Sequence, residues 1–82
     1  MEIREVFARN LKALRRAKGL SQEELAHQAD LDRTYVSSLE RCVYNASIDV
    51  VDRLALVLGV EASELLRRPP TGQVEAGADL DE

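Results

Sequence analysis

Apolar residues recur at helical spacing up to about residue 67, and no stretch alternates apolar and polar residues with a period of two. This spacing is typical of amphipathic helices, and the absence of alternation argues against a sheet. Ser21, Asp32 and Ser47 precede apolar runs as N-caps, while Gly19 and Gly59 follow such runs as stops. The pattern predicts an all-α protein, a compact five-helix bundle, with helices at about residues 3–18, 22–29, 33–41, 48–58 and 62–67.

The second and third predicted helices are joined by only three residues, Asp30-Leu31-Asp32. Two short helices across so short a turn must pack closely, which requires a small residue on one and a branched apolar residue on the other. Ala26 and Val36 occupy those places. Asp30 stands where the turn needs a left-handed backbone, a conformation that Asp adopts more readily than most residues. These features predict a helix-turn-helix.

The third predicted helix has two distinct faces. Val36, Leu39 and Glu40 point one way, and a polar stripe points the other. The members of this stripe are Arg33, Thr34, Ser37, Ser38 and Arg41. A helix with an apolar back and a front of short donors and arginines can read base edges in the major groove of DNA. An ordinary amphipathic helix would show the same stripe, so the prediction also depends on the preceding helix and turn.

The segments LSQEELAHQADLDRTYVSSLER and SIDVVDRLALVLGVEASELL resemble the lambda-repressor-like, or XRE, helix-turn-helix family over about residues 6–67. Within that family, LDRTYVS-x-LER followed by N-x-S-I is most similar to the controller proteins of restriction–modification systems. The resemblance implies a small transcriptional regulator that binds double-stranded DNA, at a palindromic operator, as a homodimer. Helices two and three would form its helix-turn-helix.

The resemblance also implies roles for single residues by matched position. Arg15 and Glu40 match a buried ion pair that ties the first helix to the recognition helix. Cys42 replaces a usual glycine and Val43 a usual Lys or Arg, so we expect an altered loop and a lost phosphate contact there. The residues implied to bind bases or phosphates are Gln22, Arg33, Thr34, Tyr35, Ser37, Ser38, Arg41 and Asn45.

The fourth and fifth predicted helices have more apolar residues than one core face can use. The predicted core stripe is Ile48, Val51, Leu54, Ala55 and Leu58. The side chains left over on this helix are Val50, Leu56 and Val57. Only one of Leu65 and Leu66 can turn inward. Contiguous exposed apolar groups usually have a partner, and we predict a dimer interface at Leu56, Val60 and Leu66. Scattered aliphatics on a monomer are the alternative.

Charge modifies this picture without reversing it. The chain has 11 basic and 15 acidic residues, a formal charge of −4, which by itself argues against nucleic acid. Residues 69–82 hold four of the acidic groups and no Lys or Arg, which leaves residues 1–68 neutral. DNA affinity follows the phosphates neutralised at the contact. We expect residues 1–68 to form the DNA-binding domain and residues 69–82 to be an acidic, disordered tail. An arm that competes with DNA is the alternative for the tail.

Other candidate chemistry is sparse. Cys42 and His27 have no partners at the spacing of metal ligands, and the serines near Arg41 have no general base at a defined spacing. We therefore expect no enzyme, metal, cofactor or evident small-molecule effector. The single cysteine and the lack of a long apolar run predict a cytoplasmic protein with no membrane partner. Two other functions stay open: the DNA-binding antitoxin of a toxin pair, and a protein-interaction module without DNA binding.

Overall fold

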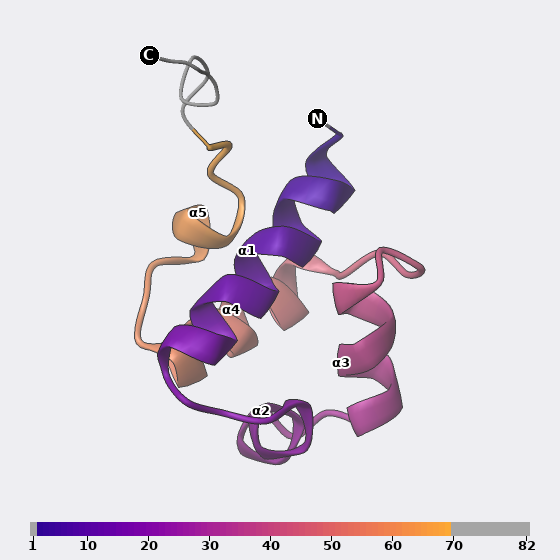
Figure 1. The fold of residues 1–82 in the computed structure, drawn as a ribbon, viewed down its shortest axis with the longest axis vertical. Helices are drawn as coiled ribbons and strands as arrows, with labels where there is room; N and C mark the ends of the chain where they lie inside the picture. Colours follow the sequence, from indigo (N-terminus) through magenta and orange to yellow (C-terminus); the bar gives the residue numbers. More distant parts are fainter. Residues whose placement is uncertain (1, 70–82) are drawn as a thin grey trace.

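A computed structural model describes residues 2–69, which form five α-helices and no strand. In Figure 1, α1 crosses the front of the molecule with α4 behind it, α2 lies below, and α3 and α5 lie on opposite sides. The all-α, five-helix prediction is confirmed. The predicted tail falls outside the described residues except for Pro69. The helices are α1 (Ile3–Ala17), α2 (Gln22–Gln28), α3 (Arg33–Glu40), α4 (Ile48–Leu58) and α5 (Ala62–Leu65).

Local capping sets where the helices begin and end. Asp32 and Ser47 each accept a hydrogen bond, of 3.0 and 3.1 Å, from a backbone N–H in the first turn of the following helix. Such a bond satisfies a donor that the helix itself leaves without a partner. Gly59 ends α4 with a φ of 72°, a left-handed conformation that costs glycine little. The start of α3 and both ends of α4 are therefore defined by local contacts. None of the helices in residues 2–69 is long and apolar enough to cross a membrane.

All five helices contribute to one hydrophobic core. Burying each large aliphatic side chain stabilises the fold by about 1.5–3 kcal/mol, so the core determines how the helices are placed relative to one another. The largest fully buried side chains are Leu11, Leu25, Leu39, Leu54, Leu65, Val6 and Val36.

The predicted core stripe of α4 is wrong at one end. Ile48 is 87% exposed, whereas Val50 and Val57, which were expected to be left over, are half-buried against the core. The other four members of the stripe are buried as predicted. Ile48 and Val50 fall on opposite edges of this stripe on a helical wheel, so periodicity cannot say which edge is covered. The packing of the neighbouring helices covers the edge that carries Val50.

Candidate nucleic-acid interface

The turn between α2 and α3 has the predicted geometry. Ala26 and Val36 are 2% and 0% exposed, and Asp30 has a φ of 58°. The N–H of Leu31 donates to the carbonyl of Ala26 over 2.8 Å, which closes the end of α2. The two helices are thus held together through the small and branched residues that the sequence placed at their crossing.

Arg53 also secures this turn, a role that the sequence analysis missed. Its Nη1 lies 3.4 Å from the carbonyl oxygen of Ala29 and 3.3 Å from that of Asp30. A cation at the C-terminal end of a helix satisfies carbonyls that have no partner within the helix. Arg53 is the only basic residue of α4. A single arginine on a mainly apolar helix was the feature of the sequence that could have indicated this role.

The exposed side of α3 carries most of the predicted contact residues. Arg33, Thr34 and Arg41 are exposed, and the half-buried Ser37 lines a shallow hollow with the first two. Ser38 is only 5% exposed, because it faces inward with Val36 and Leu39. The predicted polar stripe is therefore wrong at Ser38, whose hydroxyl does not reach the surface that the other four share.

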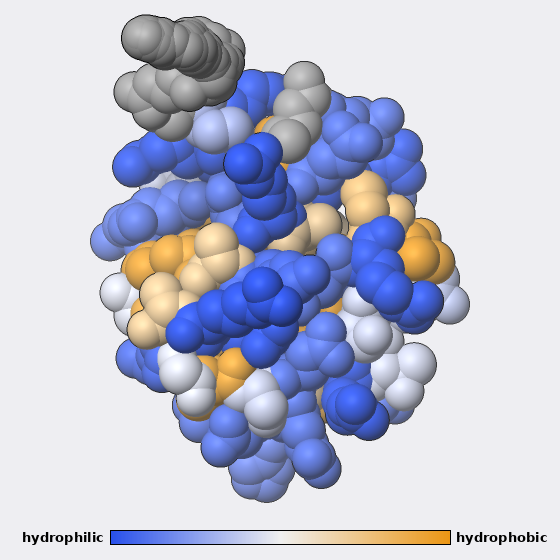
Figure 2. Space-filling model, viewed as in Figure 1, coloured by the Kyte–Doolittle hydropathy of each residue, from blue (hydrophilic) through white to orange (hydrophobic). Residues whose placement is uncertain are grey.

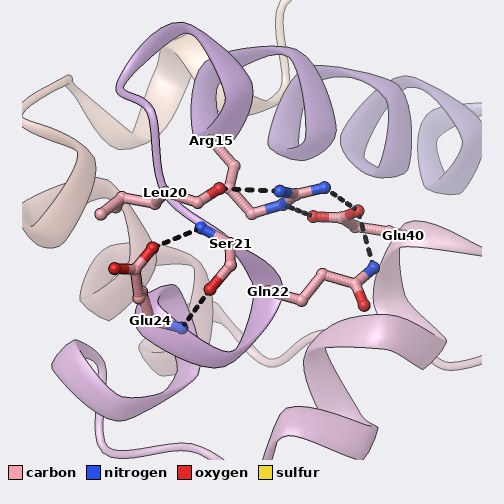
Figure 3. A network of polar contacts seen from close by, with 6 residues as sticks. All are labelled: Arg15, Leu20, Ser21, Gln22, Glu24 and Glu40. Atoms are coloured by element: carbon pink, nitrogen blue, oxygen red, sulfur yellow. Dashed lines mark hydrogen bonds and ion pairs between the residues drawn. The ribbon is translucent and has the colours of Figure 1, made fainter.

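A buried ion pair joins α1 to the C-terminal end of α3. Arg15 Nε lies 2.6 Å from Glu40 Oε2, and Arg15 Nη2 lies 3.0 Å from Glu40 Oε1 (Figure 3). The side chains of Arg15 and Glu40 are 9% and 2% exposed. Arg15 Nη1 donates to the carbonyl of Leu20 over 2.8 Å, so the connection between α1 and α2 is tied to the same group.

The ion pair shifts the protonation equilibria of both partners. The hydrogen bond to Glu40 raises the pKa of Arg15, since it stabilises the charged guanidinium. Burial by itself would raise the pKa of Glu40, but hydrogen bonds from Arg15 and Gln22 outweigh it, and the pKa is lowered. Both groups are therefore charged at neutral pH.

Gln22, the first residue of α2, belongs to this network. Its Nε2 donates to Glu40 Oε1 over 3.1 Å, which orients the amide (Figure 3). The preceding residue, Ser21, is the predicted N-cap and forms a capping box with Glu24. The N–H of Ser21 donates to Glu24 Oε1 over 2.8 Å, and Ser21 Oγ accepts from the N–H of Glu24 over 3.0 Å. These bonds lower the pKa of Glu24. The start of α2 is thereby held against the end of α3.

The loop after α3 is held by its aromatic residues. Tyr35 Oη donates to the carbonyl of Asn45 over 3.4 Å, and the rings of Tyr35 and Tyr44 lie 6.3 Å apart. Cys42 has a φ of 62°, so it adopts the left-handed conformation that glycine would adopt more easily. This φ describes Cys42 alone, so the altered geometry expected for the rest of the loop stays a prediction. Val43 is 57% exposed and brings no charge.

A second, apolar surface lies on α4 and α5. Ile48, Leu56 and Leu66 are 87%, 72% and 41% exposed. Leu65 is the one of the two leucines that turns inward, and Val60 is half-buried against the core. Figure 2 shows that the face crossed by α1 is mainly hydrophilic, with smaller hydrophobic groups toward its left and right edges. We name Ile48, Leu56 and Leu66 the α4–α5 apolar surface.

Known proteins share this arrangement. The model of a helix-turn-helix family matches residues 11–65. A hypothetical transcription factor of Neisseria meningitidis is 47% identical over 68 residues, which cover 83% of this chain and 64% of that protein. The crystal structure of a hypothetical transcription factor from Neisseria has a TM-score of 0.80 at 45% identity, covering 89% of this chain and 83% of that one.

Two further structures are similar. The restriction–modification controller protein C.AhdI from Aeromonas hydrophila has a TM-score of 0.74 at 45% identity, covering 76% of this chain and 94% of that one. SinR, described as the master regulator for biofilm formation, was solved in complex with DNA. It has a TM-score of 0.72 at 35% identity, covering 74% of this chain and 98% of that one.

The fold and the surface of α3 thus define a lambda-repressor-like protein of the class of DNA-binding transcription regulators. The chain belongs to the helix-turn-helix family, of the XRE type, and within it is similar to restriction–modification controller proteins. The relatives are regulators rather than enzymes.

Proposed function

We propose that this protein is a homodimeric transcriptional regulator, of the restriction–modification controller kind, that binds a palindromic site in double-stranded DNA. The observation that carries the proposal is the construction of α3. Its back is fully buried at Val36 and Leu39, while Arg33, Thr34 and Arg41 are exposed on its front. A helix anchored in this way can enter the major groove without disturbing the core.

The contact residues divide into two groups under this proposal. Arg33, Thr34 and Ser37 share one hollow near the start of α3, where they read base edges. The other group positions the protein on the backbone of the duplex. This second group consists of Gln22, Tyr35, Arg41 and Asn45. The hydrogen bonds of Gln22 to Glu40 and of Tyr35 to Asn45 support this assignment. They hold the start of α2 and the loop after α3 in place on either side of α3.

Two copies are needed because a single eight-residue recognition helix reads too few base pairs for specificity. We assign the dimer contact to the α4–α5 apolar surface. Leu56 and Leu66 belong to the predicted interface. Ile48 joins them, because it shares the exposed side of α4 with Leu56 and lines one hollow with Leu66. Val60 contributes less than predicted, since it is already packed against the core.

The test is selection of bound sites from a random duplex library, with no added effector, followed by gel shifts over a range of salt concentrations. We expect an enriched sequence with two-fold symmetry and an affinity that falls steeply with salt. No binding even at low salt would overturn the proposal and favour a protein-interaction module. Enrichment of a single asymmetric half-site would overturn its dimeric, palindromic part.

A further inference from the structure

Beyond Arg41, the loop that follows α3 carries no charge of its own. Residues 42–47 read CVYNAS, with neither Lys nor Arg. Under the proposed function this loop lies beside the DNA backbone, where a cation would add affinity. The first turn of α1 brings one there. Arg4 Nη1 lies 3.3 Å from Asn45 Oδ1, although the two residues are 41 positions apart in the sequence.

The guanidinium of Arg4 is oriented while its side chain stays accessible. Its Nε donates to Glu2 Oε1 over 3.0 Å, and its side chain is 55% exposed. Together with the bond to Asn45, this engages two of the five donors of the group. The plane of the guanidinium is therefore defined, and other N–H groups of Arg4 are available to an anion.

The bond to Arg4 also determines how the amide of Asn45 points. Arginine has only donors, so the amide oxygen of Asn45 must face it, and the amide nitrogen faces away. That nitrogen provides two more N–H donors on the exposed loop. Arg4 and Asn45 thus form a corner of N–H donors with one positive charge, which is the chemistry that binds a phosphate.

We propose that Arg4 supplies a cation to residues 42–47 of this loop and, with Asn45, binds a phosphodiester of the DNA backbone beyond the recognition helix. This inference rests on the proposed function, because only a DNA-bound protein brings a phosphate to this corner. Glu2 opposes the contact, since its carboxylate lies against the same guanidinium and repels an approaching phosphate.

The first experiment compares Arg4→Gln with Arg9→Gln in gel shifts against the selected duplex and a random duplex. Arg9 is a matched control, because it is an exposed arginine of the same helix, five residues on and so about 140° around the axis from Arg4. We expect Arg4→Gln to weaken binding to both duplexes about tenfold. The slope of log K against log salt should fall by about one for each subunit. Arg9→Gln should change neither quantity as much.

A second variant tests whether removing the carboxylate beside Arg4 tightens DNA binding. Glu2→Gln removes the competing carboxylate, so it should tighten binding to both duplexes about twofold to fivefold and steepen the salt dependence. A purely structural role of the Glu2–Arg4 pair predicts no gain in binding. Thermal melts of the three variants check that each is folded as the wild type is, since an exposed pair contributes little to stability.

The possible outcomes separate this inference from the proposed function. If the wild type binds DNA and Arg4→Gln behaves as Arg9→Gln does, the contact at the corner is refuted and the proposed function stands. If the wild type binds neither duplex, both are overturned. If Arg4→Gln reduces binding to the selected duplex alone, Arg4 reads a base, and the phosphate contact is refuted.

Discussion

Arg33 and Arg41 stand at opposite ends of α3 and differ in their surroundings. Arg33 is the first residue of the helix and shares a hollow with Thr34 and Ser37, whereas Arg41 follows its last residue, beside the loop. The start of a recognition helix lies nearest to base edges, and residues toward its end approach the backbone. Two arginines on one helix are therefore expected to act differently.

Replacing Arg33 by alanine should remove sequence preference at one base position. The expected cost is about 1–3 kcal/mol of binding free energy on the selected duplex, the value for an arginine that contacts a guanine through two hydrogen bonds. Affinity for random DNA should change much less. Competition gel shifts with single-base variants of the selected duplex measure both quantities. Equal losses on selected and random DNA would make Arg33 a phosphate contact.

Arg41→Ala should weaken binding to all sequences alike. A phosphate contact lowers the slope of log K against log salt by about one when it is lost. The measurement is the same salt titration on selected and random duplexes, with Arg33→Ala as the comparison. An unchanged slope would place Arg41 outside the interface.

The buried pair of Arg15 and Glu40 determines how one element is placed against another. It joins α1 to the end of α3, and Gln22 brings the start of α2 to the same carboxylate. The two elements that face DNA under the proposed function, α2 and α3, are thereby fixed to α1 through one charged group. The orientation of the recognition helix thus depends on this pair as well as on the core.

Removing one partner of the pair should destabilise the fold strongly. Arg15→Met or Glu40→Gln leaves an uncompensated buried charge, which costs about 3–5 kcal/mol, a large part of the total stability of so small a domain. The double variant Arg15→Met/Glu40→Leu should recover much of the loss, since apolar replacements of buried pairs are often tolerated. Urea unfolding measures the free energy of each variant. Single variants as stable as the wild type would contradict this prediction.

The lowered pKa of Glu40 makes the contribution of the pair depend on pH. A carboxyl group whose pKa is lower in the folded than in the unfolded chain stabilises the fold above its unfolded pKa, about 4.3, and loses this effect as pH falls through the folded value. The difference in unfolding free energy between wild type and Glu40→Gln should therefore be constant near neutral pH and shrink in acid. Urea titrations at several pH values test this, with the exposed Glu23→Gln of α2 as control. A difference independent of pH would contradict it.

At the scale of the whole molecule, the α4–α5 apolar surface and the face of α3 are two separate parts of one regulator. The α4–α5 apolar surface consists of exposed aliphatic side chains, whereas the face of α3 consists of hydrogen-bond donors and positively charged groups. A two-fold contact through the apolar surface would place two recognition helices about 34 Å apart, one turn of DNA. Binding to a palindrome then depends on both surfaces.

Leu56→Glu combined with Leu66→Glu should give a folded monomer that binds the palindromic duplex far more weakly. Buried carboxylates in a dimer contact are costly, whereas exposed ones leave the monomer unaffected. Ile48→Glu should act in the same way, because Ile48 is the most exposed large hydrophobic residue described. Sedimentation measures the mass, and circular dichroism checks the fold. A wild type that is already monomeric at high micromolar concentration would refute the proposed dimer contact.

The features of the candidate site that depend on residues close together in the sequence were predictable. The caps at Asp32 and Ser47, the left-handed Asp30 and the polar face of α3 follow from residue chemistry over a few positions. The prediction failed at Ser38, because the width of a buried face depends on what packs against it. It missed Arg53 and Arg4, whose partners lie 23 or more positions away in the chain.

Hydrophobic periodicity and capping act within one or two turns of chain. The sequence therefore predicted the helix-turn-helix, the number of helices, the first residue of each and the last residue to within two positions. Packing between the helices determined which edge of α4 is covered, so that Val50 is packed and Ile48 exposed. It also decided that Cys42 keeps the left-handed turn and that Arg4 meets the loop after α3. These outcomes depend on contacts between elements distant in the chain, where packing of the whole core outweighs the preference of any one residue.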